Sequence, residues 1–229
     1  MKLEVRAMTL TPSRKLIYPD SDGQPMADNT LQFHWIVLFK ENLECLFRDN
    51  LDVFVGGDLL WYPVEGHPEI RVAPDVMVVF HRPKGERGSY RQWEENGIAP
   101  QVVFEILSPG NRLAEMAKKL EFYEQYGVEE YYIYDPQLNE LSGYQRVGNR
   151  LRVIEEMNGW VSPRLDIRFA LTNDELLVYY PNGERFKTTV ELAQELEQTQ
   201  QELLLERQRA ERLAAYLRSQ GINPDEIGG

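Results

Sequence analysis

Apolar residues along this chain follow two different periods, and the change from one to the other separates helices from strands. Between residues 31 and 48 apolar side chains recur every three or four positions, which predicts a helix with Asp28, Asn29 and Thr30 as N-cap candidates. Shorter apolar runs bounded by turn residues predict strands at 51–62, 70–80, 102–107, 130–135, 141–156 (a hairpin), 165–171 and 176–180. We expect the last two strands to complete an edge of one sheet.

A second helical period follows the strand at 102–107. It predicts a helix over 112–126, with Asn111 as its N-cap and Gly127 at its C-terminal end. An apolar stripe is expected to face the sheet. The stripe consists of Leu113, Met116, Ala117 and Leu120.

Two acidic residues interrupt strands that are otherwise apolar. Glu105 lies inside the run from Val102 to Leu107, and Asp75 lies inside the upstream run VAPDVMVVF. A carboxylate in a core strand is unfavourable unless a hydrogen bond, a cation or a metal compensates it. Side chains alternate between the two faces of a sheet, so strands paired in register would point both carboxylates toward one ion.

Three polar residues of the second helix lie along the flank of its apolar stripe. Glu115, Lys119 and Tyr123 succeed each other at four-residue steps and therefore share one side of the helix. Lys119 can lean over the sheet toward the two acids. The alternative is a surface pair between Glu115 and Lys119, an interaction worth about 0.5 kcal/mol.

A basic segment separates the strand of Asp75 from the strand of Glu105. Residues 81–99 are too polar for a core and too long for a tight turn, and HRPKGERGSYR within them has a single acid, Glu86. Its basic residues are Arg82, Lys84, Arg87 and Arg91, with Tyr90 and then Trp93 interleaved. Such a loop contacts a phosphate backbone or is a solvated excursion, and the sequence favours neither reading.

Two isolated polar residues are weaker candidates. Asp58 follows the pair Gly56-Gly57, so a role in a turn or bulge is favoured over a role in a site. His34 lies on the first predicted helix without a second histidine near it, which is more typical of a satisfied or partly exposed side chain than of a ligand.

Composition sets the class of protein. The 229 residues allow one sizeable domain with appendages or two small domains. A content of 42% hydrophobic and 27% charged residues is ordinary for a soluble globular protein. No apolar run approaches the roughly 20 residues that span a membrane, and the N-terminus lacks the core of a secretory signal. The single cysteine, Cys45, suits a reducing cytoplasm. A net charge of −12 argues against nonspecific adhesion to DNA, although a local basic surface remains compatible with it.

Two strand acids, a lysine and a basic loop favour metal-assisted chemistry on a phosphodiester. Mg²⁺ or Mn²⁺ takes oxygen ligands, commonly one or two carboxylates with waters and substrate phosphate. A bound ion lowers the pKa of its water, and a nearby lysine can neutralise the charge of the transition state. One cysteine and three scattered histidines give no zinc set, and neither a P-loop nor a G-x-S-x-G elbow is present.

An ordered series of residues resembles a known family. The series is Pro74-Asp75, Glu105-Ile106-Leu107-Ser108, Lys119, Tyr123, Gly127-Val128 and Glu130 to Pro136. It is similar to the Uma-type family of predicted restriction endonucleases, in the PD-(D/E)XK nuclease superfamily, and the chain looks like a cyanobacterial-type member. The resemblance covers about residues 25–180. It implies an α/β (α+β) fold with a restriction-endonuclease-like core, in which helices flank a central mixed sheet.

The resemblance also implies roles for particular residues. Asp75 and Glu105 would be metal ligands, with the backbone carbonyl of Ile106 as a third oxygen. The lysine that the superfamily places two residues after the glutamate is Leu107 here, so its role can fall only to a residue elsewhere, and Lys119 is the candidate. Glu115 stands where the family often has aspartate. The glutamate usual before the first helix is missing from DGQPMADN.

Two classes of function follow from this resemblance. The first is a metal-dependent endonuclease that hydrolyses phosphodiester bonds of DNA with Mg²⁺ or Mn²⁺. The alternative is a catalytically inactive module of the same fold that binds nucleic acid or a protein partner. We expect Asp75, Glu105 and Lys119 to be catalytic in the first case, with Asp58, Glu115 and Tyr123 in support.

The chain beyond the predicted strands changes character. We expect an N-terminal arm at 1–30, a nuclease domain at 31–186, a helix at 187–220 and a tail at 221–229. The helix carries apolar residues at alternating steps of four and three, the spacing of a coiled coil. The seam is Leu192, Leu196, Thr199, Leu203, Glu206, Ala210, Leu213 and Leu217. Thr199 and Glu206 interrupt this seam. We expect a homodimer whose association depends on the helix, because nucleases that cut both strands often act as pairs, while folding back on the domain remains the alternative.

Overall fold

The structure is a computed structural model that describes residues 16–110 and 113–223 except 22, 24 and 222. It divides into two compact units, Met1–Phe186 and Lys187–Gly229. The predicted cap Asn111 lies outside the described residues, as do most of the N-terminal arm and the tail. In the described part, no helix is long and apolar enough to cross a membrane.

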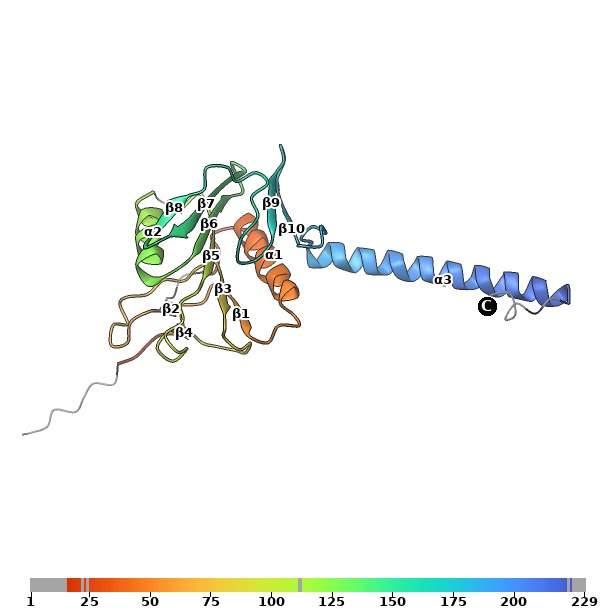
Figure 1. Cartoon of the computed structure of the whole chain (residues 1–229), viewed down its shortest axis with the longest axis horizontal. Helices are drawn as coiled ribbons and strands as arrows, with labels where there is room; N and C mark the ends of the chain where they lie inside the picture. The colour runs from red at the N-terminus through yellow and green to blue at the C-terminus, as the bar shows by residue number, and fades with distance from the viewer. Residues whose placement is uncertain (1–15, 22, 24, 111–112, 222, 224–229) are drawn as a thin grey trace, which may run out of the picture. The chain divides into compact units, whose positions relative to one another are not determined.

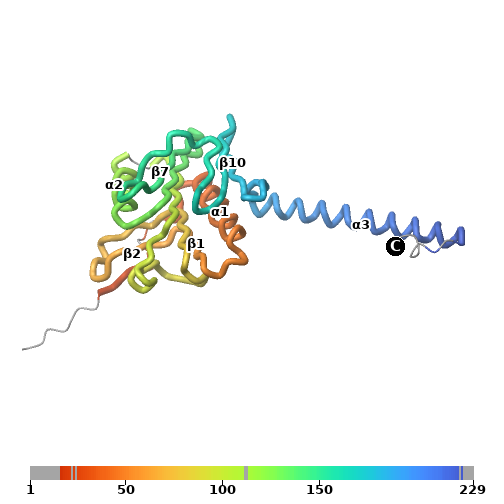
Figure 2. Tube along the Cα trace, in the orientation of Figure 1, coloured from red at the N-terminus to blue at the C-terminus, as the bar shows by residue number. Residues whose placement is uncertain are grey.

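The first unit is built on a six-stranded mixed sheet in the order β1-β3-β5-β6-β7-β8 (Figure 1). All neighbouring strands pair antiparallel except β5 and β6, which are parallel. A parallel pair requires a crossover connection, and α2, which lies between β5 and β6 in the chain, supplies it. The path of the chain through α2 can be followed in Figure 2. The strands are β1 (Val53–Gly57), β3 (Val76–Phe80), β5 (Val102–Ile106), β6 (Glu130–Asp135), β7 (Glu140–Val147) and β8 (Arg150–Val153).

Helix α1 (Thr30–Leu46) covers one face of this sheet. Asn29 caps it, because its side chain accepts a hydrogen bond from the Gln32 N–H at 2.9 Å. A small sheet of β9 (Arg168–Leu171) and β10 (Leu176–Tyr179) packs on the same side. The buried residues of this layer include Trp35, Phe39, Val78, Phe104, Tyr132, Phe169 and Val178.

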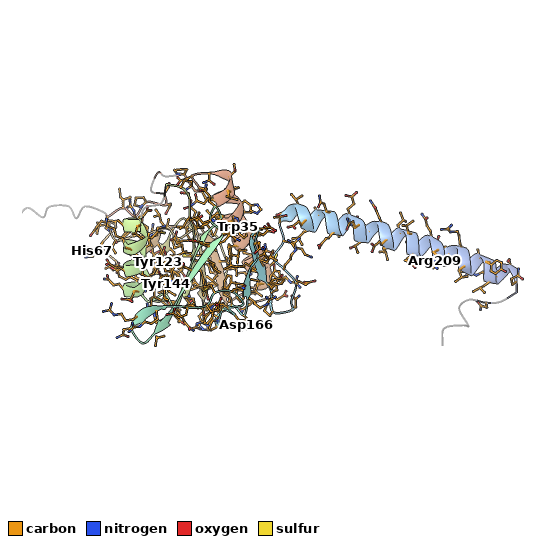
Figure 3. The ribbon with its side chains drawn as sticks, turned by 90° about the horizontal axis from the view of Figure 1, so that it is seen from above. Trp35, His67, Tyr123, Tyr144, Asp166 and Arg209 are labelled. Carbon is orange, nitrogen blue, oxygen red and sulfur yellow. The ribbon has the colours of Figure 1, made fainter. Side chains whose placement is uncertain are left out.

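Helix α2 (Leu113–Tyr126) covers the opposite face together with β2 (Trp61–Tyr62) and β4 (Tyr90–Arg91). The buried residues here include Trp61, Met77, Val79, Tyr90, Val103, Tyr123 and Tyr131. Figure 3 shows Tyr123 and Tyr144 on this side of the sheet and Trp35 on the α1 side. The predicted fold class, a central mixed sheet flanked by helices with a long C-terminal helix, is confirmed.

Two predictions about packing are wrong. The strands β9 and β10 do not complete an edge of the large sheet but form a separate two-stranded sheet. The expected inward stripe of α2 is wrong for two of its four residues: Leu113 is 88% exposed and Ala117 is exposed, whereas Met116 and Leu120 are half-buried and Leu120 packs against the core. The helix is rotated so that Lys119 and Tyr123 face the sheet, because their partner there is the buried carboxylate of Glu105.

The second unit contains the helix α3 (Thr189–Ser219). A capping box begins it: the Thr188 side chain accepts from the Glu191 N–H, and the Glu191 carboxylate accepts from the Thr188 N–H. No residue of α3 is buried.

Candidate active site

Glu105 lies on β5, and Asp75 directly precedes β3, the strand that pairs with β5. In the antiparallel pair of β3 and β5, Val76 is opposite Phe104 and Met77 is opposite Val103. One further step in this register places Asp75 opposite Glu105, on the face that α2 covers. The two acids therefore belong to the same face of the sheet, as strand alternation predicted, although β3 begins one residue after Asp75 and not at residue 70.

Glu105 is held by two side chains of α2. Lys119 Nζ lies 2.7 Å from Glu105 Oε2, and the Tyr123 hydroxyl donates to Oε1 at 2.5 Å. The residues Lys119 and Tyr123 are one helical turn apart, so a single face of α2 contacts both oxygens of the carboxylate. The carboxylate is 3% exposed and the lysine side chain 19% exposed, which makes this a buried ion pair rather than a surface pair with Glu115.

Asp75 is compensated less completely than Glu105. Its Oδ2 accepts a hydrogen bond of 2.6 Å from the Ile106 N–H. Burial, followed by repulsion from the Glu105 charge, raises the pKa of Asp75 well above its usual 3.8, against the opposing influence of Lys119 and the Ile106 N–H. The ionised form of Asp75 is thus destabilised in the folded protein and would gain from an added cation.

Lys119 and Tyr123 both keep their protons. Burial by itself lowers the pKa of Lys119, but the negative charges of Glu105 and Asp75 outweigh it and raise the pKa above its usual value. Burial and the adjacent Glu105 raise the pKa of Tyr123. At neutral pH the lysine is therefore an ammonium ion and the tyrosine a neutral hydroxyl, so both act as donors.

A cleft of about 450 Å³ opens beside these residues. Asp58, Asp75, Glu115 and Lys119 line it together with Asp28 and Gln32. Asp58 directly follows β1 with a φ of 45°, its N–H donates to the Asp75 carbonyl, and its charge contributes to the raised pKa of Asp75. The structure therefore brings the turn aspartate and two residues of α2, Glu115 and Lys119, to the same cleft, whereas Tyr123 lies buried behind it.

Gln32 is a site residue that sequence reasoning missed. Its Nε2 donates to the Ile106 carbonyl at 2.8 Å, and its Oε1 accepts from the Asp28 N–H at 2.8 Å. It lies in the first turn of α1, just after the segment DGQPMADN in which the family's glutamate was sought. The sequence contained one signal, because Gln32 is a polar residue at helical spacing from the apolar residues Ile36, Phe39 and Leu43. In the structure Gln32 is 7% exposed.

The basic loop does not converge on the cleft as a group. The Arg82 and Lys84 backbones bond to Asp52 and Leu51, next to the end of β3 that is remote from Asp75. The side chains of Arg82 and Arg87 pair with Glu95, at 3.5 and 2.7 Å, and Arg87 lies over the Phe54 ring. Arg91 pairs with Glu94 and Asp20, at 3.4 and 4.0 Å. Their predicted contact with nucleic acid stays a prediction.

The donor set fits a hard cation. Asp75 and Glu105 supply carboxylates and Ile106 a carbonyl oxygen, and each of these oxygens has a second lone pair beyond the hydrogen bond it already accepts. No group of three or more histidine, cysteine, aspartate or glutamate side chains that could hold a metal ion occurs in the described part of the chain. An ion here would therefore complete its shell with waters and substrate oxygens.

Removing the Tyr123 hydroxyl tests how firmly Glu105 is held. We expect Tyr123→Phe to lower the free energy of unfolding by about 1.5–3 kcal/mol, because a buried carboxylate loses a donor. Urea denaturation measures the change. Tyr126→Phe on the same helix is the matched control, since its hydroxyl only accepts a surface hydrogen bond from Gln125. Equal effects of the two substitutions would contradict a structural bond to Glu105.

A family model decides where this chain belongs. The model described as "Uma2: Putative restriction endonuclease" matches residues 21–172. The chain is a member of the Uma2 family. The Uma2 match begins ahead of α1 and ends just after β9, so it contains Asp75, Glu105, Lys119 and Tyr123. The helix α3 lies outside it.

One solved structure and one negative result complete the comparison. A crystal structure described as "a putative nuclease belonging to DUF820", from Anabaena variabilis ATCC 29413, is 15% identical to this Uma2 member, with a TM-score of 0.42. The similarity covers 62% of this chain and 78% of that one. The search of curated proteins found no match.

Proposed function

We propose that this Uma2 protein is a metal-dependent endonuclease that hydrolyses phosphodiester bonds of DNA. The observation that carries the proposal is the facing pair Asp75 and Glu105, with Lys119 bonded to the glutamate at the edge of a cleft. Two carboxylates can hold a metal ion, and an ammonium group beside them can stabilise the negative charge that develops during phosphodiester hydrolysis. The family description supports a nuclease, and DNA is the substrate class that its restriction type implies.

The charge of the cleft supports a role for a cation. Four acids, Asp28, Asp58, Asp75 and Glu115, line it against one lysine, so a phosphodiester alone would be repelled. Asp75, Glu105 and the Ile106 carbonyl are the proposed ligands. Mg²⁺ or Mn²⁺ held there would lower the pKa of a bound water and polarise the phosphate.

The side chains of α2 have separate proposed roles. Tyr123 and Lys119 hold the Glu105 carboxylate in one orientation, since each donates to a different oxygen. Lys119 carries a raised pKa and stays charged, which favours stabilisation of developing negative charge over action as a general base. Lys119 contacts Glu105 from α2. This contact supports the proposal that Lys119 takes the role of the superfamily's lysine, whose position is occupied by Leu107 in this chain.

Nicking of supercoiled plasmid DNA tests the function. We expect the purified protein to convert supercoiled to open-circular DNA in Mg²⁺ or Mn²⁺, and EDTA to abolish the conversion. Glu105→Gln, which keeps an acceptor for Tyr123, should reduce nicking to background. Glu121→Gln is the matched control, since Glu121 is exposed on the same helix and does not line this cleft.

The outcome separates the two classes of function. Nicking that persists in Glu105→Gln, or in EDTA, would show that another site or a contaminant cleaves the DNA. A folded protein that binds DNA without cleaving it under any divalent ion would instead support the inactive module.

A further inference from the structure

The helix α3 has an apolar seam that no described residue of its own unit covers. Leu192, Leu196, Leu203 and Leu213 are 47, 60, 70 and 58% exposed. A helix of 31 residues in water normally depends on packing of such a face rather than on intrinsic helix propensity. The heptad spacing of the seam fits a second helix of the same kind as its cover.

Charge along α3 is divided between its two halves. Residues 189–206 contain five glutamates and no lysine or arginine, a net charge of −5. Residues 207–219 contain four arginines and one glutamate, a net charge of +3. Two copies that run parallel would place like charges together along their whole length, whereas two antiparallel copies place each acidic half against a basic half.

The seam also matches itself when one copy is reversed. In the heptad the a positions are Leu196, Leu203, Ala210 and Leu217, and the d positions are Leu192, Thr199, Glu206 and Leu213. When one copy is reversed, every a position meets a d position of the partner. This gives four different layers, each of which occurs twice by two-fold symmetry. These layers are Leu192 with the partner's Leu217, Leu196 with the partner's Leu213, Thr199 with the partner's Ala210, and Leu203 with the partner's Glu206. Both polar interruptions of the seam thus face an apolar residue instead of a copy of themselves.

The positions that flank the seam agree with this direction. At the g positions, Glu202 meets the partner's Arg209 twice by symmetry, and Glu195 meets the partner's Tyr216, with no like-charge pair. In the parallel arrangement Glu206 would instead share a layer with the partner's Glu206. In a single copy Arg209 lies 3.7 Å from Glu206, so one arginine can also compensate the glutamate of the central layers.

We propose that α3 associates with the α3 of a second copy as an antiparallel two-stranded coiled coil, with Glu202 and Arg209 selecting the direction. The partner is this chain itself, because the charge pattern and the layers are self-complementary only after reversal. The proposal concerns α3 alone and is independent of the nuclease chemistry.

Charge-swapped full-length chains test the direction. Glu202→Arg and Arg209→Glu should each raise the dimer dissociation constant by roughly tenfold or more, because each creates two like-charge contacts. An equimolar mixture of the two variants should recover the wild-type dissociation constant, since the arginine introduced at position 202 of one chain then meets the glutamate introduced at position 209 of the other. Analytical ultracentrifugation measures both. In a parallel pair the partner of Glu202 is Arg207, so mixing would bring no recovery.

Disulfide trapping gives a second, independent readout. In a Cys45→Ser background, which removes the exposed free cysteine, Leu192→Cys and Leu217→Cys are made in separate chains of different tag size. Oxidation of the mixture should yield the mixed 192–217 crosslink and little of either same-residue crosslink. A dominant 192–192 product, a monomeric wild-type protein or an assembly larger than two chains would each overturn the proposal.

Discussion

Replacing Lys119 with methionine is expected to lower the free energy of unfolding by about 3–5 kcal/mol and to abolish cleavage. The substitution keeps most of the side-chain volume but leaves Glu105, whose side chain is 3% exposed, as a buried charge without its cation. Denaturation by urea in EDTA measures the stability, and plasmid nicking measures the activity. Lys118→Met is the matched control: it makes the same change at the adjacent exposed position, and we expect it to alter stability by less than about 0.5 kcal/mol.

A double substitution separates the structural role of Lys119 from its catalytic role. In Lys119→Met/Glu105→Gln the buried charge is gone and the Tyr123 hydroxyl still has an acceptor, so most of the lost stability should return. Activity should not return, because the double variant lacks both the ammonium group and a ligand. A single Lys119→Met variant that is as stable as the wild type and cuts DNA at the same rate would remove Lys119 from the site.

The pairing of the two acids could be predicted from sequence because it depends on local rules. An acid in an apolar strand is conspicuous, and strand alternation fixes the side of the sheet to which its side chain points. Antiparallel pairing of β3 with β5 then brings Asp75, the residue before β3, to the same face as Glu105. The helical step of four likewise put Lys119 and Tyr123 on one side of α2.

The rotation of α2 could not be predicted in the same way. Hydrophobic periodicity assigned the inward side to Leu113 and its neighbours, whereas the structure turns Lys119 and Tyr123 toward the sheet and leaves Leu113 exposed. The contact that decides this rotation is an ion pair with a residue of another element, and a period calculated along one helix contains no information about it. Tertiary contact overrides amphipathicity here.

A second buried acid shows why strand position alone does not define a site. Glu130 is 1% exposed on β6, yet the Tyr132 hydroxyl, the Ser162 hydroxyl and the Arg164 N–H all donate to its carboxylate. These three donors compensate the charge of Glu130. The side chain of Glu130 lies on the α1 side of the sheet, beside the first residue of β5, whereas Glu105 lies near the last residue of β5. The sequence could not separate this structural acid from Asp75, because two of the three donors, Ser162 and Arg164, come from a distant loop.

Replacing Asp75 with asparagine is expected to stabilise the metal-free protein while it abolishes cleavage. In the folded protein burial and the nearby Glu105 raise the pKa of Asp75, so its ionised form opposes folding. Asparagine has no charge to bury, and its amide oxygen can still accept the Ile106 N–H that Asp75 Oδ2 accepts at 2.6 Å. Urea denaturation of both proteins in EDTA at pH 7 measures the gain.

The pH dependence of this gain has a definite sign. A carboxyl group with a raised pKa binds its proton more tightly in the folded state than in the unfolded state, where the pKa is near 3.8. Its favourable contribution is present at low pH and is lost as the pH rises through the folded-state pKa. The stability difference between Asp75→Asn and the wild type should therefore be small near pH 4 and grow toward neutral pH. Asp49→Asn, whose side chain is 92% exposed, is the control and should show no such trend.

Divalent metal should reverse the order of stability. If Asp75 is a ligand, Mg²⁺ or Mn²⁺ at a hundred times its dissociation constant stabilises the wild type by about 2.7 kcal/mol, whereas Asp75→Asn gains little. Thermal melts with and without metal follow the change, and Glu105→Gln should respond as weakly as Asp75→Asn. The same carboxylate would then cost stability in the empty cleft and provide it when the ion is bound, which is the behaviour expected of a ligand. An equal metal-dependent shift in the wild type and both variants would place the ion elsewhere.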